Sequence, residues 1–262
     1  MTVTLVRLGP ARGLPLLVLG PSIGTSAETL WGPAARYLND SFDVVGWDLP
    51  GHGTNADPGT GDLLMEHLAS DVLAAVDALG GGTFFYAGDS VGGAVGLQLL
   101  LDAPERVNAA ALFCTGAKIA DAESWAQRIE EVHASGTPSL VSGSAERWFA
   151  PGFLEREPAT GSALLHALSD TRDAGYVAVC HALREFDVRD WLGEISTPVL
   201  AVAGAHDPAT PPDKLREIAD GVQDGRLVVL DDASHAAPAE KPDEVARLIR
   251  EHCLGPVTQE DR

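Results

Sequence analysis

The chain has 262 residues, which is enough for one α/β domain with a large core, or for such a domain with an insert. Its 18 basic and 38 acidic residues give a formal net charge of −20, which argues against binding to nucleic acid or to anionic membrane surfaces. The first residues lack a basic segment followed by an apolar run, and no stretch is long and apolar enough to span a bilayer, so we expect a cytoplasmic protein.

Apolar runs of strand length alternate with helical patterns along most of the chain. The expected strands are Val3 to Leu8, Pro15 to Leu19, Asp43 to Trp47, Thr83 to Ala87, Ala109 to Cys114, Val199 to Ala203 and Leu227 to Leu230. The expected helices are Gly32 to Asn39, Leu64 to Leu79, Gly92 to Leu101, Asp213 to Ala219 and Asp243 to His252. Several strands are apolar on both faces, as in a sheet that is covered on both sides. The alternation predicts a doubly wound, mostly parallel sheet.

One stretch, from about Asp121 to Trp191, contains no convincing strand. Helical spacing places Trp125, Ile129 and Val132 on one face, and the prolines that punctuate the stretch indicate short helices. We interpret it as a helical lid inserted after the fifth core strand. The expected division is a core of residues 1–120 and 191–254, a lid of residues 121–190, and a flexible tail of residues 255–262.

The segment Gly88 to Gly92 reads GDSVG and stands between an apolar strand and a helical run. This GxSxG pattern is typical of a nucleophile elbow, a sharp strand-to-helix turn that exposes the serine hydroxyl. Ser90 is therefore the candidate nucleophile, and the N–H of Val91, at the start of a helix, is a candidate oxyanion donor. An ordinary glycine-rich turn is the alternative reading of this pattern alone.

A serine hydroxyl needs a general base, which an acid must orient, and on this fold the partners follow in the order serine, acid, histidine. Asp207 follows the buried strand Val199 to Ala203, and His235 follows the last strand, so they are the candidate acid and base. Alone, Asp207 could be a turn residue before a proline, and the other histidines are expected to be structural or solvated. The three types in the right order, each after its own strand, favour a catalytic triad.

The second oxyanion donor should lie in the loop after the second strand, where the chain reads GPSIGT from Gly20 to Thr25. The backbone N–H of Ile23 is the best-placed candidate there. The three cysteines are widely scattered and lack metal-ligand spacing, so we expect reduced thiols and no metal site.

Longer segments resemble one family over almost the whole chain. They are LVLGPSIGTSAETLW (17–31), DLPGHG (48–53), APERV (103–107), TGAKIADAESWAQRI (115–129), ERWFAPGF (146–153), GYVAVCHALREFDVR (175–189) and AGAHDPATPP (203–212). On these residues the chain is similar to the α/β-hydrolase superfamily and, more closely, to the 3-oxoadipate enol-lactonases of the β-ketoadipate pathway. One departure is GDSVGG, because the family usually has an apolar residue where Asp89 precedes the serine.

The resemblance implies the α/β-hydrolase fold and the opening of a small anionic enol-lactone, without metal or organic cofactor. The substrate carboxylate would need a local cation, for which Arg128, Arg147 and Arg184 in the lid are candidates. Trp125 and Trp148 would line the substrate pocket. Each arginine alone is more typical of a surface ion-pair residue, and each tryptophan alone is more typical of the lid's own core.

The resemblance also implies possible fusion or association with a carboxymuconolactone decarboxylase, since some relatives are joined to one. Two alternatives to the enol-lactonase stay open at this point. One is an esterase or lactonase of the same fold with another small acyl substrate. The other is a non-catalytic hydrolase-like binding protein, which the intact triad disfavours.

Overall fold

A seven-stranded sheet forms the centre of the protein, whose computed structural model describes residues 3–58 and 61–255. The strands lie in the order β1-β3-β2-β4-β5-β6-β7, and only β1 runs antiparallel to its neighbour. They are β1 (Thr4–Arg7), β2 (Leu16–Gly20), β3 (Asp43–Asp48), β4 (Phe84–Asp89), β5 (Val107–Phe113), β6 (Val199–Gly204) and β7 (Gly225–Leu230). The predicted doubly wound, mostly parallel sheet is confirmed.

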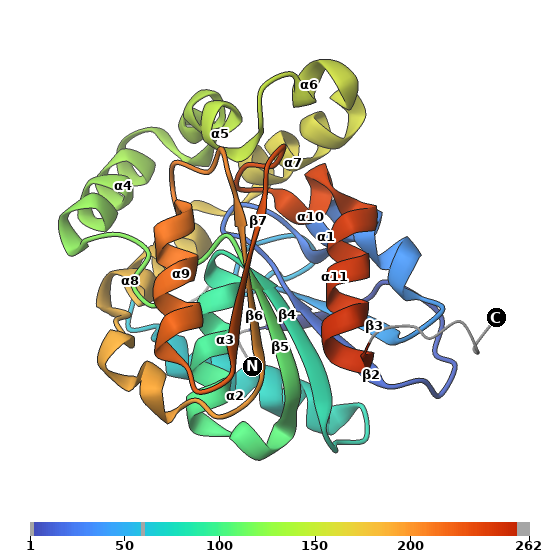
Figure 1. Cartoon of the computed structure of the whole chain (residues 1–262). Helices are drawn as coiled ribbons and strands as arrows, with labels where there is room; N and C mark the ends of the chain where they lie inside the picture. Colours follow the sequence, from blue (N-terminus) through green and yellow to red (C-terminus); the bar gives the residue numbers. More distant parts are fainter. Residues whose placement is uncertain (1–2, 59–60, 256–262) are drawn as a thin grey trace.

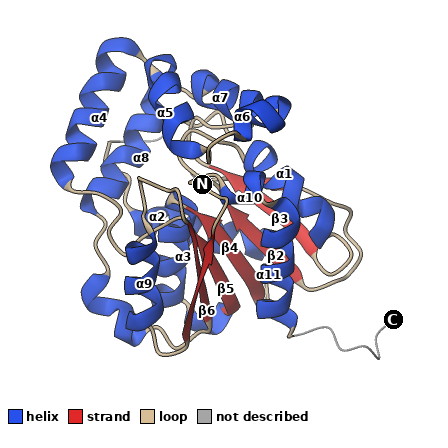
Figure 2. Cartoon of the chain, turned by 45° about the horizontal axis from the view of Figure 1, so that its top comes forward, coloured by secondary structure: helices blue, strands red, loops and turns tan. Residues whose placement is uncertain are grey.

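Helices cover both faces of this sheet (Figure 2). They are α1 (Ala27–Leu38), α2 (Met65–Ala78), α3 (Val91–Asp102), α9 (Pro212–Gly221), α10 (Ala237–Glu240) and α11 (Pro242–Leu254), with a short 3-10 turn η1 (Pro104–Arg106). Helices α1 and α11 pack together on one face, and α2, α3 and α9 lie on the other (Figure 1). Both faces of the central strands are therefore buried, which explains their continuous apolar runs.

Helix α1 begins five residues before the expected start at Gly32. Ser26 and Thr29 form a capping box, in which each side chain binds the other's backbone N–H, and this box sets the start. The helix accommodates Pro33 in its interior. The expected start at Gly32 is therefore too late, because the cap residue Ser26 lies upstream of it.

The stretch between β5 and β6 consists of helices and loops and contains no strand among its residues, all of which the structure describes. Its elements are α4 (Ala122–Ser135), η2 (Thr137–Leu140), α5 (Val141–Trp148), α6 (Phe153–Arg156), α7 (Pro158–Asp170), α8 (Asp173–Glu185) and η3 (Arg189–Glu194). Helices α4 to α7 lie over one edge of the sheet (Figure 1), and we call residues 121–190 the lid. The expected tail, apart from Gly255, falls outside the described residues.

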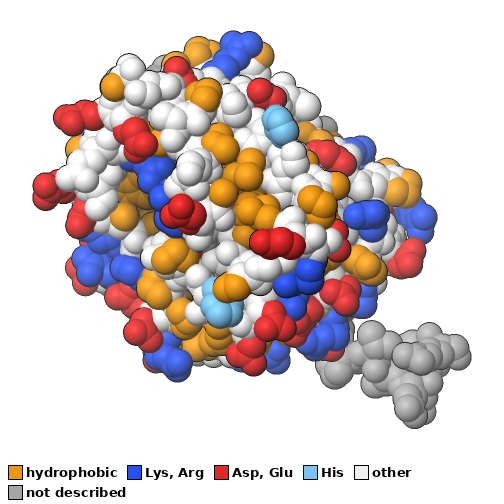
Figure 3. All heavy atoms as spheres, turned by 90° about the horizontal axis from the view of Figure 1, so that it is seen from above, with side chains coloured by type: hydrophobic (Ala, Val, Ile, Leu, Met, Phe, Trp, Pro, Cys, Tyr) orange, Lys and Arg blue, Asp and Glu red, His pale blue; other side chains and the backbone are white. Residues whose placement is uncertain are grey.

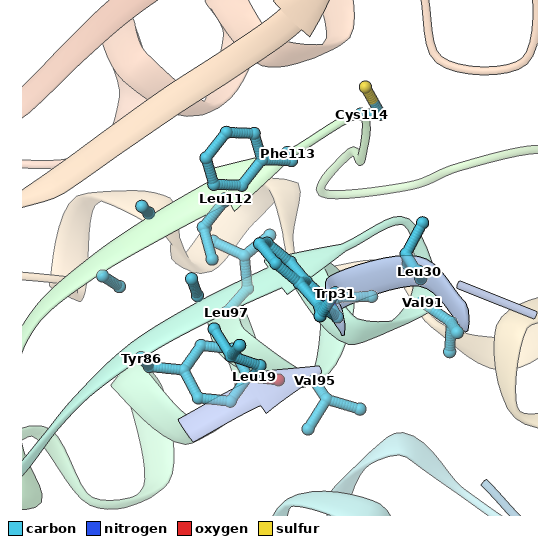
Figure 4. Packing of buried hydrophobic residues seen from close by; sticks show 14 of the residues in the cluster. Leu19, Leu30, Trp31, Tyr86, Val91, Val95, Leu97, Leu112, Phe113 and Cys114 are labelled. Atoms are coloured by element: carbon cyan, nitrogen blue, oxygen red, sulfur yellow. The ribbon is translucent and has the colours of Figure 1, made fainter. Parts of the chain in front are cut away.

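The core beneath this edge is built from large side chains of the central strands and their helices (Figure 4). Trp31 of α1 meets Phe113 of β5 edge to face, with ring centroids 5.7 Å apart, and its indole N–H donates to the carbonyl oxygen of Gly20. The Tyr86 hydroxyl donates to the carbonyl oxygen of Gly92 at 2.7 Å. These contacts join the ends of β2 and β5 to α1, and β4 to the start of α3. Within the described ranges, no helix is both long and apolar enough to cross a membrane.

Candidate active site

Ser90 occupies the turn between β4 and α3 with φ of +54° and ψ of −116°, in the region that non-glycine residues rarely adopt. Its N–H donates to the carbonyl oxygen of Phe113 at 2.9 Å, and its own carbonyl oxygen accepts the Thr115 hydroxyl at 2.6 Å. The end of β5 therefore holds the strained turn in place. This is the backbone that the GxSxG pattern predicts.

The two glycines of the pattern are required by close packing on either side of the serine. A Cβ at Gly88 would collide with the backbone of Gly92, and a Cβ at Gly92 would collide with the backbone of Gly20. The N–H of Gly92 also donates to the carbonyl oxygen of Pro21 at 2.9 Å, which joins the β2 loop to the start of α3. The elbow and the oxyanion loop thus form one rigid unit.

The expected oxyanion donors, Ile23 and Val91, both lie close to Ser90. Ile23 lines the same pocket as the serine, and Val91 is the first residue of α3. Their backbone N–H groups have no acceptor among the described residues. Two free N–H groups beside a nucleophile, one at a helix N-terminus, suit the stabilisation of a developing oxyanion.

The predicted acid and base are in direct contact. His235 Nδ1 lies 2.7 Å from Asp207 Oδ2, and both side chains are buried. With the proton on Nδ1, which the carboxylate accepts, Nε2 is the free basic nitrogen. His206, the histidine next to the acid in sequence, is exposed, and the hydrogen bonds of the Asp207 side chain to described residues go to Ala209, Thr210 and His235 instead. Ser90 Oγ makes no hydrogen bond to a described residue, and the transfer of its proton to His235 therefore requires the two side chains to approach during the reaction.

Thr210 completes the support of the acid, a role that the sequence reading missed. Its hydroxyl donates to Asp207 Oδ2 at 2.6 Å, and its N–H and that of Ala209 donate to Oδ1 at 3.1 and 2.8 Å. A threonine three residues after the acid is the local signal that could have indicated this turn. The carboxylate therefore has one orientation available.

The contact between His235 and Asp207 shifts the pKa of both side chains. Burial alone would lower the pKa of His235, but the attraction and hydrogen bond of Asp207 outweigh it and raise that pKa above its ordinary value of 6.5. Burial would raise the pKa of Asp207, but His235 and the Thr210 hydrogen bonds lower it. The acid thus stays ionised, and the imidazolium that forms during proton transfer is stabilised.

A pocket of about 100 Å³ brings most of the predicted site residues together. Its lining includes Ser90, His235 and Ile23 from the core, and Trp125, Arg128, Arg147 and Trp148 from the lid. Ile119, Ser144, Tyr176 and Ala209 complete the wall. The pocket is small and mostly apolar, so it suits a compact acyl substrate.

The three candidate arginines have different surroundings. Arg147 is partly buried, donates to Ser144 Oγ at 3.4 Å, and forms no salt bridge with any carboxylate that the structure describes. Burial lowers its pKa, and the neighbouring Arg128 lowers it further. Arg128 pairs weakly with Glu131 at 3.8 Å. Arg184 lies outside the pocket lining and pairs with Glu185, so its position gives no support to a substrate-binding role.

Asp89, beside the nucleophile, does not enter the pocket. It is fully buried, and neither carboxyl oxygen has a hydrogen-bond partner among the described residues. Burial raises its pKa well above the ordinary value. Burial thus disfavours a negative charge on this carboxyl, and the side chain is not part of the pocket lining that an anionic substrate would meet.

A second buried acid, Glu240, was not identified from the sequence. Its carboxylate accepts the backbone N–H of Ser234, next to the catalytic histidine, and that of Ala150 in the lid. Burial raises its pKa to about 7. No local pattern marks this residue, because its contact with the lid spans 90 positions of sequence.

Comparison with known proteins connects this geometry with a family. The model of the alpha/beta hydrolase fold matches residues 15–153, and that of the TAP-like proteins matches residues 169–254. The chain is 36% identical over 228 residues to 3-oxoadipate enol-lactonase 2 of Acinetobacter baylyi, covering 87% of this chain and 84% of that protein.

A second relative carries a different activity in its name. The chain is 30% identical to the Agrobacterium fabrum protein RutD, whose name proposes carbamate hydrolase activity, over 87% of this chain and 89% of that protein. Among solved structures, the enol-lactonase from Burkholderia xenovorans LB400 superimposes with a TM-score of 0.90 at 30% identity, covering 95% of each chain.

Proposed function

Because this chain belongs to the α/β-hydrolase family, we propose that it hydrolyses a small anionic lactone, 3-oxoadipate enol-lactone, to 3-oxoadipate. The similarity to proteins named enol-lactonase supports the substrate, and the free Arg147 in the pocket carries the argument. A partly buried guanidinium without a carboxylate partner is energetically costly. A substrate carboxylate would supply the missing partner.

Ser90 and His235 perform the first half of the reaction. The serine oxygen attacks the ring carbonyl while His235 Nε2 takes its proton, and the N–H groups of Ile23 and Val91 hold the oxyanion. Collapse of this intermediate breaks the ring C–O bond. The proton returns from His235 to the leaving oxygen, which gives an enol that becomes a ketone.

Water completes the second half of the reaction. His235 takes a proton from the water, whose oxygen attacks the acyl-enzyme carbonyl, and a second oxyanion forms in the same place. Collapse returns the proton to Ser90 Oγ and releases the carboxylate product. Tautomerisation of the enol makes the overall ring opening favourable.

The test compares an anionic lactone with a neutral ester in matched arginine variants. A charge-assisted hydrogen bond contributes about 1.5–3 kcal/mol, so Arg147→Met should lower kcat/KM for the enol-lactone roughly tenfold or more. Hydrolysis of p-nitrophenyl acetate should change little. Arg184→Met removes the same group outside the pocket and is the control, with both activities near those of the parent.

The ratio of the two activities distinguishes the outcomes. An unchanged ratio in Arg147→Met, and also in Arg128→Met, would remove the physical support for an anionic substrate. A parent protein that hydrolyses the neutral ester but leaves the enol-lactone intact would favour another small acyl substrate. A carbamate should then be assayed, since a relative's name proposes that activity.

A further inference from the structure

A row of hydrogen bonds joins the loop of the catalytic histidine to one stretch of the lid. The Ser234 hydroxyl donates to the carbonyl oxygen of Arg147 at 2.9 Å. The N–H of Ala236 donates to the carbonyl oxygen of Trp148 at 2.9 Å. The neighbours of His235 on both sides thus bind the backbone of two pocket residues. We call these contacts the seam.

Glu240 contacts both sides of the seam through its two carboxylate oxygens. Oε1 accepts the N–H of Ser234 at 2.7 Å, and Oε2 accepts the N–H of Ala150 at 2.6 Å. The side chain is buried, and no Lys or Arg of the described ranges forms a salt bridge with it. One side chain therefore fixes a core loop and the lid simultaneously.

The cost of burying this group indicates that it does more than end a helix. Glu240 is the last residue of α10, and a local role there would need only the nearby bond to Ser234. The second bond reaches across to the lid. A buried carboxylate is unfavourable unless it is hydrogen-bonded, and the two short N–H contacts supply that compensation.

We propose that Glu240 is a positioning residue that holds the His235 loop and the lid stretch of residues 147–150, which carries the pocket residues Arg147 and Trp148, at a fixed separation. The base and the groups that contact substrate then move as one unit, and a small misplacement of either slows the reaction. The proposal rests on His235 acting as the base in the proposed function. It does not depend on which lactone or ester is the substrate.

The first variant is Glu240→Gln, which keeps the shape of the side chain. Its amide offers one oxygen as acceptor but turns an NH₂ group toward the other N–H, so one of the two bonds is lost. Glu244→Gln makes the same chemical change on α11, where the acid pairs with Arg247 at the surface, and serves as the matched control. The rate of p-nitrophenyl acetate hydrolysis is divided by the concentration of protein whose Ser90 reacts with a fluorophosphonate.

We expect kcat per labelled serine to fall roughly tenfold or more in Glu240→Gln and to stay at the parent value in Glu244→Gln. Glu240→Asp keeps the carboxyl group but is too short to reach both donors, so its kcat should lie between that of Glu240→Gln and that of the parent. A purely structural role would lower the labelled fraction or Tm and leave the rate per labelled serine unchanged. That result would overturn the proposal.

The normalisation keeps the test decisive when folding is incomplete, because only labelled protein is counted. If Glu240→Gln is insoluble, Glu240→Asp is judged by the same criterion against Glu244→Gln. The neutral ester also separates this proposal from the substrate assignment. A parent inactive on enol-lactone but active on the ester would contradict that assignment, while the Glu240 comparison would still be made on the ester.

Discussion

Ser90 combines two roles that conflict energetically, because the nucleophile must occupy a backbone conformation that disfavours side chains. Residues in such regions cost about 1–3 kcal/mol and persist only where the surroundings hold them. The hydrogen bonds from Thr115 and to Phe113 are those restraints. Strain at this residue is therefore part of how the hydroxyl is presented to the pocket.

Two substitutions of Ser90 should distinguish the catalytic role of its hydroxyl from the strain of its backbone. Ser90→Ala and Ser90→Gly should both lose turnover by about 10⁴- to 10⁶-fold, since the covalent nucleophile is gone. Glycine accepts positive φ, so Ser90→Gly should unfold at a higher temperature than Ser90→Ala, by the equivalent of about 1 kcal/mol. Steady-state assays and thermal unfolding of both variants check this. Full activity in Ser90→Ala would refute the serine mechanism.

The raised pKa of His235 predicts where activity is lost on acidification. The base must be neutral, so kcat/KM should increase with pH through an apparent pKa above 6.5. Asp207→Asn removes the attraction that raises the pKa of His235. The acidic limb of the pH-rate profile should therefore move to lower pH, while kcat falls by about 10⁴-fold. The pH-rate profiles of parent and variant measure both effects. A limb that stays at the same pH would mean that Asp207 does not control the base.

Asp89 lowers the stability of the fold, because its buried carboxyl has no hydrogen-bond partner among the described residues. A buried polar group without a hydrogen bond costs about 1–3 kcal/mol, and valine suits a strand end of this kind. Asp89→Val should therefore raise Tm by several degrees, as about 2–4 °C per kcal/mol is usual at this chain size. Calorimetry of the two proteins provides the measurement. A lower Tm would show that partners such as internal water hold the carboxyl.

At the scale of elements, periodicity was sufficient to locate the seven strands and the helices that flank them. Chain order then placed Ser90, Asp207 and His235 at one edge, since the ends of parallel strands meet there. The expected start of α1 at Gly32 was wrong, because the capping box of Ser26 and Thr29 begins the helix at Ala27. Local patterns thus predict the strands better than the ends of helices.

The lid shows what a sequence does not reveal about a site. Its short helices were expected, but the periodicity of a short helix does not say which face meets the pocket. Arg128 and Arg147 line the cavity, while Arg184 pairs with its neighbour Glu185. Glu240 gave no signal at all, because its role depends on a lid contact far away in sequence. The role of such residues depends on contacts between segments that are far apart in the sequence.

Over the whole molecule, the net charge of −20 opposes the approach of an anionic substrate. The face over the lid carries both signs of charge around a central group of hydrophobic side chains (Figure 3), so the repulsion on this side is diffuse. Attraction comes from the partly buried Arg147. The two effects differ in their response to salt, because exposed charges are screened far more than partly buried ones.

Added salt should therefore favour the anionic substrate. Between about 0.01 M and 0.15 M the Debye length falls from about 30 Å to about 8 Å, which removes most of the long-range repulsion and little of the contact with Arg147. We expect KM for the enol-lactone to fall by about two- to threefold over this range, while KM for p-nitrophenyl acetate stays constant. Two salts with different anions separate screening from competition at Arg147. A KM that rises with salt would show that attraction by the pocket arginines, and not repulsion by the acidic surface, governs the approach of the substrate.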